Sequence, residues 1–215
     1  MPVVFDRRVS SSILGHLLGA IAGSSVTRKT SFLLDALGTQ VFARNVTICD
    51  DPHRPRGLRS RPFDGEGLPV SPMTLVADGM LETWLLDSAA ARQLGLEPTG
   101  HAVRGVGGAP SVGPSNLYLA NGKTPVASLI ADIDYGIYVT DLIGQGINLV
   151  TGDYSRGAAG YLIEGGVITT PVSEFTVAGT LQSMFRELVP ANDLNFRYGI
   201  NVPTLRIDGM TVASG

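Results

Sequence analysis

Three turn pairs join short apolar segments of this chain and constrain its fold more than any other feature. They are Asp78-Gly79, Gly165-Gly166 and Asp208-Gly209. Such pairs between apolar segments are strong signals of β-hairpins, because both residues can adopt positive φ. The segments between them do not follow the strand–helix–strand alternation of a parallel sheet. The sequence therefore predicts an α+β fold with largely antiparallel, hairpin-linked sheets and a few short helices.

Other segments carry signals for single elements. Ser88 to Leu94 predicts a short helix that ends at Gly95. "TPVASLIADIDYG" and "TLQSMFRELV" predict two more helices, whereas "VVF", "NVTICDDP" and "SNLYLANG" predict strands. A further strand is expected at "TQVF", directly after Gly38. The glycine-rich segment 103–113 is expected to be a flexible connection.

The stretch "SSSILGHLLGAIAGSS" predicts an amphipathic helix, capped by Asp6 or Ser10. Its leucines and isoleucines recur at helical spacing and form one apolar stripe. His16 lies on the other side, where a metal ligand, a catalytic base and a packing residue are all open interpretations. We expect it to be hydrogen-bonded within this face and to hold no metal. The neighbouring positions on that face are small: Ser12, Gly15, Gly19 and Gly23.

Composition limits the classes of function. The 215 residues carry a net charge of −3, and only 16% are charged. The densest basic run, His53 to Arg61, is flanked by aspartates, so a nucleic-acid partner is not expected. Cys49 is the only cysteine, which excludes an intrachain disulfide and a multi-cysteine zinc site. We expect a cytoplasmic chain with no membrane partner, because no apolar run approaches ~18 residues and "MPVVFDRR" is unlike a secretory signal.

Several phrases together resemble one known family. They are "SFLLDALGTQVF", "PFDGEGLP", "DGMLETWLLDSAAARQLGLEPTGHA", "TGDYSRGAAGYLIE" and "PTLRIDGMTVAS". On these phrases the chain is similar to the C-terminal half of the TldD/PmbA family, and within it to the PmbA branch, also called TldE. The resemblance implies that residues 1–215 form a single C-terminal domain of that type, without the family's N-terminal half.

The resemblance also implies where a zinc site would lie. TldD-type members carry zinc on a His-Glu-x-x-x-His helix, and that motif falls on Ser11, Ser12 and His16 here. Two of the three groups are therefore replaced, and a serine hydroxyl is a poor zinc ligand that cannot act alone as a base. We therefore expect no metal, cofactor or catalytic residue in this chain, with His16 as a weak catalytic candidate. Ser11, Ser12 and His16 are instead assigned to a substrate or subunit interface.

The remaining candidates are weaker. The TldD-type cysteine near the C-terminus has no counterpart in "NDLNFRYGINVP", and Cys49 is expected to be a structural thiol. His53 and His101 lack the spacing of a metal pair. Ser155 and Ser173 are not in a nucleophile elbow. In "GDYSRGAAG", Asp153 and Arg156 are expected to anchor a turn by ion pairing and hydrogen bonds.

Three functions stay open at this point. The first is a non-catalytic PmbA/TldE-like subunit that pairs with a zinc-bearing TldD-type subunit, or with a second copy, in peptide proteolysis or maturation. Such a dimer would bind an extended peptide, for example by strand addition. The second is a metallopeptidase active in its own right through His16. The third, lesser one is the interaction with DNA gyrase that has been associated with the family.

Overall fold

The computed structural model describes residues 1–214, and the side chains of residues 1–213. Its main part is a seven-stranded sheet in which β1 and β8 are parallel and every other pair of neighbours is antiparallel. The strand order is β11 (Leu188–Pro190), β13 (Leu205–Ile207), β1 (Val3–Phe5), β8 (Tyr135–Ile143), β9 (Asp153–Glu164), β10 (Val167–Thr180) and β14 (Thr211–Ser214).

A second sheet has five strands, and only its β12–β7 pair is parallel. A third consists of two short antiparallel strands. The five-stranded order is β12 (Ile200–Asn201), β7 (Leu117–Leu119), β2 (Ile48–Asp50), β3 (Met73–Ala77) and β4 (Met80–Leu81), and the two-stranded sheet pairs β5 (Ala102–Val103) with β6 (Ser111–Val112).

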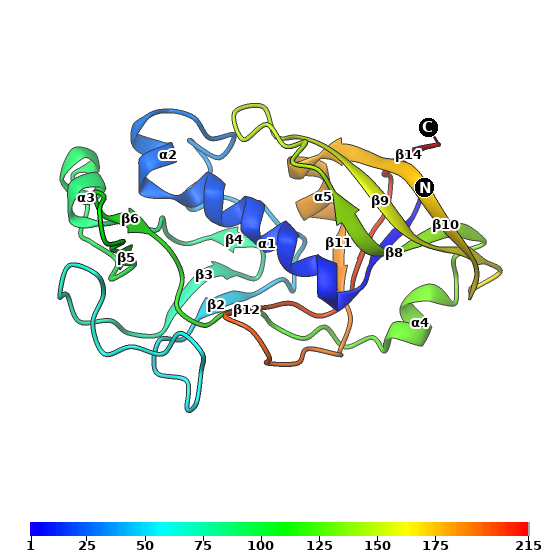
Figure 1. Ribbon diagram of the computed structural model, residues 1–215, viewed down its shortest axis with the longest axis horizontal. Helices are drawn as coiled ribbons and strands as arrows, with labels where there is room; N and C mark the ends of the chain where they lie inside the picture. Colours follow the sequence, from blue (N-terminus) through cyan, green and yellow to red (C-terminus); the bar gives the residue numbers. More distant parts are fainter. Residues whose placement is uncertain (215) are drawn as a thin grey trace.

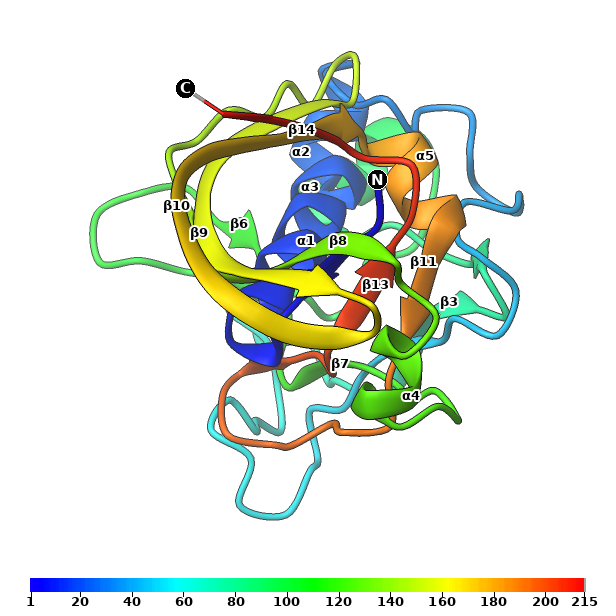
Figure 2. The same ribbon diagram turned by 90° about the vertical axis from the view of Figure 1, so that its right-hand side faces the viewer.

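Helix α1 (Arg7–Ile21) lies along the long axis of the molecule and connects the two larger sheets (Figure 1). It contacts β1 and β8 of one sheet and β12 of the other. Its apolar stripe is fully buried at Ile13, Leu14, Leu17 and Ile21. Figure 2 shows β8, β9, β10 and β14 curving around one end of this helix. On the other side of the helix His16 packs against Tyr154 of β9, whereas Gly15 is exposed.

Local signals account for where the helices begin and end. The Asp6 carboxylate accepts the Arg8 N–H at 2.9 Å, so Asp6, rather than Ser10, caps α1. Asp87 caps α3 (Ser88–Leu94) in the same way, and Gly95 ends it with φ of 67°. The other helices are α2 (Gly23–Thr27), α4 (Val126–Ile130) and α5 (Leu181–Glu187).

The α+β prediction is confirmed, and two of the three predicted hairpins are present. Asp78 and Gly79 have φ of 47° and 82° between β3 and β4, and Gly165 and Gly166 have φ of 54° and 77° between β9 and β10. These values match the tight turn that suits the twist of a hairpin.

The predicted hairpin at Asp208-Gly209 is wrong. β13 pairs with β1 and β11, whereas β14 pairs with β10 at the other end of the sheet order. The sheet curves so far that this turn leads from one side of the curve to the other (Figure 2). A turn signal fixes the local bend but not the neighbours of the strands that follow it.

Two other expectations need correction. The strand expected at "TQVF" is only an isolated bridge between Gln40 and Met80. The glycine-rich segment expected to be a connection carries the β5–β6 pair at its two ends. Among the described residues, no helix has the length and apolar character that crossing a membrane requires.

Candidate functional site

The first part of the candidate site is an open groove beside the first half of α1. Ser11 and Ser12 both line it, and its volume is about 350 Å³. Both serines are half-buried, and the Ser12 hydroxyl donates to the Val9 carbonyl at 2.7 Å. This bond occupies the Ser12 proton within the helix itself. The other walls of the groove are Arg8, Val9, Asp141, Leu142, Arg156 and Ile200.

His16 lies one turn further along α1 and is not among the groove's lining residues. Its ring packs edge-on against Tyr154 of β9, with 5.8 Å between the ring centroids and 67° between the planes. Burial, together with the charge of Arg156, lowers the pKa of His16 to about 4. The imidazole is therefore neutral at neutral pH.

The expectation that His16 is hydrogen-bonded is wrong. Its Nε2 atom is buried and has no hydrogen-bond partner among the described residues of this chain. The Tyr154 hydroxyl and Arg156 Nε share this condition, and burial raises the pKa of Tyr154 to about 12. Tyr154 and Arg156 flank Ser155 on β9, and alternation places both side chains on the same face of that strand.

This set of donors does not fit a zinc ion. A zinc site needs about three anionic or neutral N, S or O ligands, and His16 supplies one imidazole. Arg156 brings a positive charge that lowers the pKa of that same imidazole. Across the residues that the structure describes, no group of three or more His, Cys, Asp or Glu side chains is arranged to hold a metal. We derive no chemical step through a metal in this chain.

Arg156 was assigned from sequence to a turn with Asp153, and the structure corrects this. Both residues belong to strand β9, and among the described residues they form no ion pair. Asp153 instead bonds Thr151, the residue two before it. The guanidinium of Arg156 is directed to the groove and to His16, because the strand's register places it there.

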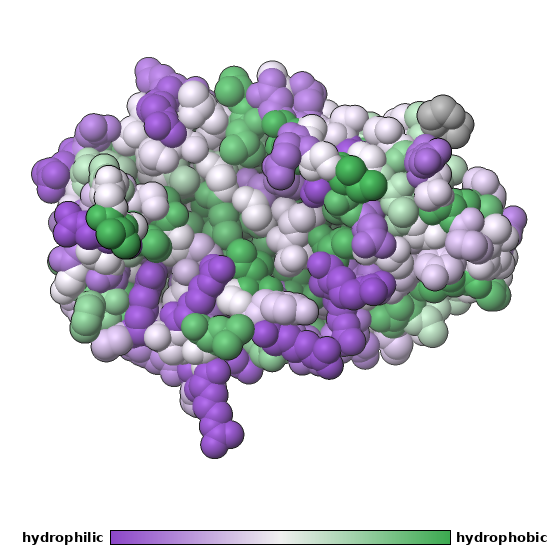
Figure 3. All heavy atoms as spheres, in the orientation of Figure 1, coloured by the Kyte–Doolittle hydropathy of each residue, from purple (hydrophilic) through white to green (hydrophobic). Residues whose placement is uncertain are grey.

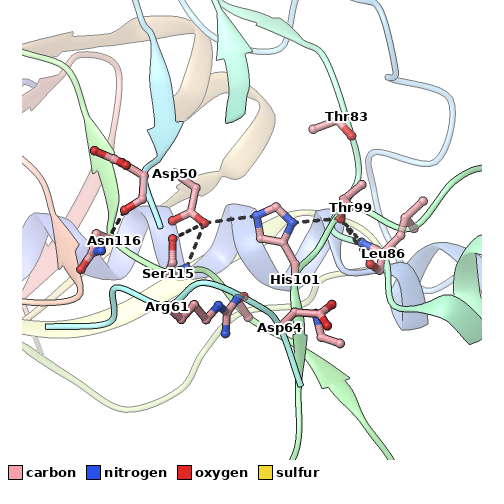
Figure 4. A network of polar contacts seen from close by, with 12 residues as sticks. Asp50, Arg61, Asp64, Thr83, Leu86, Thr99, His101, Ser115 and Asn116 are labelled. Carbon is pink, nitrogen blue, oxygen red and sulfur yellow. Dashed lines mark hydrogen bonds and ion pairs between the residues drawn. The ribbon is translucent and has the colours of Figure 1, made fainter. Parts of the chain in front are cut away.

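Sequence reasoning missed a second polar cluster, in which Asp50, Thr99 and Ser115 lie around the buried His101 ring (Figure 4). His101 Nε2 lies 3.2 Å from the Asp50 carboxylate, and its Nδ1 lies 2.9 Å from the Thr99 hydroxyl. Ser115 donates to the same Asp50 oxygen from its N–H at 2.9 Å and from its hydroxyl at 2.7 Å. Burial opposes ionisation of Asp50, but the bonds from His101 and Ser115 outweigh it, so the pKa of Asp50 is lowered.

The order Thr99–His101–Asp50 superficially matches a nucleophile, base and acid. His101 is only 3% exposed, however, and the Thr99 hydroxyl also accepts the Leu86 N–H at 2.8 Å. The nucleophile is thus engaged by the backbone, and the base is sealed from solvent. We assign this cluster to joining β2, the loop before β5 and the start of β7. The only sequence signals for it were Asp50 at a strand end and His101 beside the glycine-rich segment.

The other sequence candidates lie apart from the groove. Cys49 is half-buried, as expected, with its sulfur 3.8 Å from the Thr74 hydroxyl. His53 is exposed in the basic loop. Ser155 is an exposed residue of β9 whose N–H bonds Gly146, and Ser173 lines a separate shallow depression at the β9–β10 bulge.

Residues 1–214 match the model of the PmbA/TldA metallopeptidase C-terminal domain. The chain belongs to the PmbA/TldD family. It is 43% identical over 99% of its length to the metalloprotease PmbA of Escherichia coli, and 41% identical to a PmbA homologue of Haemophilus influenzae. It covers 45% and 46% of those two proteins.

Solved structures agree with the family. One from Bacteroides thetaiotaomicron, named as a proposed modulator of DNA gyrase, matches with a TM-score of 0.89 at 32% identity. The match includes all of this chain and 47% of the Bacteroides protein. TldE of Thermococcus kodakarensis has the same fold, with a TM-score of 0.89 at 24% identity over 99% of this chain and 50% of its own.

Proposed function

We propose that this PmbA/TldD-family chain is a PmbA/TldE-like, non-catalytic subunit that supports peptide hydrolysis by a zinc-bearing TldD-type partner. The observation that carries the proposal is the residue set on α1 and β9. Serine hydroxyls occupy two of the α1 positions that line the groove, and the remaining histidine is neutral and packed on Tyr154.

Peptide hydrolysis by zinc needs an ion to activate water and a carboxylate to accept the proton of that water. Asp141 lines the groove, but no imidazole accompanies it there. Arg156 adds a positive charge that opposes binding of a second cation. This chemistry supports a subunit that binds or positions a peptide and leaves bond cleavage to the partner.

An extended peptide is the substrate class that suits this fold. Within residues 1–214, β14 pairs with β10 from Phe175 to Ala178, while β10 itself begins at Val167. The earlier half of β10 therefore has a ladder with β9 on one side and an edge on the other. A peptide added to such an edge is recognised through its backbone, so one site can serve many sequences.

The partner we propose is a TldD-type subunit, with a second copy of this chain as the other possible occupant of the same interface. We place the pair in the cytoplasm, because a reducing compartment suits a chain whose single cysteine is free and half-buried. Relatives named as metalloproteases also permit a chain active in its own right, and the gyrase name of one solved structure permits an interaction role.

The test separates these roles by metal content and by activity. The purified chain is analysed for zinc, then mixed with an unfolded reporter peptide alone and after addition of a TldD-type subunit. We expect no stoichiometric zinc, no cleavage alone, and cleavage that rises when both subunits are present. Stoichiometric zinc that disappears in His16→Ala, together with cleavage by this chain alone, would refute the proposal and establish an independent metallopeptidase.

A matched variant sharpens the test. Ser11→Ala with Ser12→Ala removes both hydroxyls, neither of which supplies a zinc ligand under this proposal. We expect the variant to remain folded, because only one hydrogen bond within α1 is lost, so that any loss of support for the partner's activity reports on the interface role of the two serines. DNA affinity that falls with added salt, in place of any peptide effect, would instead support the gyrase-type role.

A further inference from the structure

A second cleft adjoins the Ser11/Ser12 groove at the start of α1. Its volume is about 380 Å³, and it shares Arg8 and Ile200 with the groove. The two hollows therefore meet along one side of the helix. We call the second one the arginine cleft. Its lining residues are Asp6, Arg7, Arg8, Asn195, Arg197, Tyr198, Ile200, Asn201 and Val202.

The arginine cleft has an excess of positive charge. Arg8 is already paired with Asp6, at 2.9 Å between Nε and Oδ1. Asp6 also accepts the Tyr138 hydroxyl at 2.8 Å, so the only carboxylate of the cleft wall is fully engaged. Arg7 and Arg197 are exposed, and within residues 1–213 neither has a carboxylate at ion-pair distance.

The wall opposite α1 is held in place by a buried side chain. Asn201 is 3% exposed, and its Oδ1 accepts the N–H groups of Arg197 and Tyr198 at 2.8 and 2.9 Å. Its Nδ2 donates to the Tyr198 carbonyl at 2.7 Å. These three bonds fix the turn that carries Arg197. Two unpaired guanidiniums thus stand on two anchored elements, the α1 start and this turn.

The chemistry of the cleft selects an anion with planar, paired acceptors. A guanidinium presents its N–H donors in a fork that matches a carboxylate, and a cleft of this kind concentrates the field of its charges. Figure 3 shows hydrophilic side chains gathered below the start of α1 and over the segment that leads to β12. The adjoining groove is bordered by the exposed carboxylate Asp141, which disfavours a long run of phosphates.

We propose that the arginine cleft binds a carboxylate of the peptide that lies in the Ser11/Ser12 groove, with Arg7 and Arg197 as its recognition residues. The inference rests on the proposed peptide-binding function, and it places the bound peptide along the Ser11/Ser12 groove rather than on the free edge of β10. It adds a substrate class, namely peptides that carry an anionic group at one end of the bound stretch. That carboxylate belongs to the peptide's C-terminus or to an Asp or Glu side chain, and the two sources share the same chemistry.

The test is fluorescence anisotropy with the whole chain and three labelled peptides of one extended sequence. The first ends in a free carboxylate, the second in an amide, and the third in an amide but with one Glu in place of Gln. We expect the carboxylate to strengthen binding about tenfold over the plain amide, as paired guanidiniums do for a charged acceptor. Whichever acidic peptide shows the gain identifies the source of the carboxylate.

The variant Arg7→Ala with Arg197→Ala should lose this gain, so that all three peptides bind equally. Arg7→Lys with Arg197→Lys should retain part of it, which excludes loss of folding as the cause. Arg92→Ala, an exposed arginine on α3 outside the cleft, is the matched control and should leave the gain unchanged.

Three results would overturn the inference. One is equal affinity of the wild type for acidic and amidated peptides. The second is an acidic preference that survives loss of both arginines. The third is displacement of the acidic peptide by duplex DNA with the same dependence on the two arginines. If the three peptides bind equally but the chain still supports cleavage by a TldD-type partner, only the role of the arginine cleft is refuted. The proposed function is decided separately, by the zinc and activity assay.

Discussion

Truncation of His101 to alanine should destabilise the fold strongly, because it breaks a buried polar cluster. Asp50 is ionised, since its pKa is lowered, and a carboxylate only accepts hydrogen bonds. His101 Nε2 must therefore carry the hydrogen directed at Asp50, and Nδ1 can accept from Thr99. Both side chains of the Asp50–His101 pair are 3% exposed, so bulk water does not reach the pair in the folded chain.

The magnitude follows from what is removed and what is left. A hydrogen bond to a charged group contributes about 1.5–3 kcal/mol, and removal of one partner of a buried pair costs about 3–5 kcal/mol. Ser115 keeps two bonds to Asp50, which places His101→Ala near the lower end, at about 3 kcal/mol. For a chain of 215 residues this corresponds to a fall of about 6–12 °C in Tm.

The measurement is urea unfolding followed by the fluorescence of Trp84, the single tryptophan, which is buried. His53→Ala is the control, because His53 is exposed in the basic loop. This substitution should change the free energy of unfolding by no more than about 0.5 kcal/mol. His101→Gln retains a donor and should fall between the two. If His101→Ala is no more destabilising than His53→Ala, the cluster does not hold these segments together.

Three further outcomes are expected. Asp50→Asn should be less stable than the wild type at neutral pH, because a carboxyl with a lowered pKa stabilises the fold only while it is ionised. As the pH drops below about 3.8 the variant should lose less stability than the wild type, which unfolding measured across an acid titration tests. The wild type should lose at most about 2 kcal/mol of stability between about pH 6.5 and pH 5, because the unfolded chain protonates His16 at a higher pH than the folded chain does. His16→Phe should not show this loss, and identical pH profiles of wild type and variant would contradict the prediction. Gly79→Ala should lower the stability of the fold more than Gly209→Ala, although both glycines have positive φ (82° and 75°). A Cβ at Gly79 would meet neighbouring backbone, whereas a Cβ at Gly209 would meet open space, and thermal melts of the two variants compare the losses.

About half of the candidate site could be found from sequence. Ser11, Ser12 and His16 were located on one helix, and the structure places the two serines in a groove. His16, however, faces Tyr154 rather than that groove. Its partners come from β9, which is distant in the chain, and helical periodicity carries no information about which strand will cover a helix face.

The features that the sequence by itself determined are local. Asp6 and Asp87 cap their helices, and the glycine-containing turns at 78–79 and 165–166 close hairpins, because each depends on residues within three or four positions. The resemblance to the PmbA/TldD family is likewise carried by short sequence phrases such as "TGDYSRGAAGYLIE".

Only the tertiary structure decided the features that join distant segments. It separated β13 from β14 across the curved sheet, joined Asp50 to His101, and brought Arg7 and Arg197 to one cleft. The separation of β13 from β14 depends on how the seven-stranded sheet curves around α1, and the other two contacts depend on how loops distant in the chain pack together, which no short stretch of sequence specifies. Local propensity determines where the chain turns, whereas packing determines what meets there.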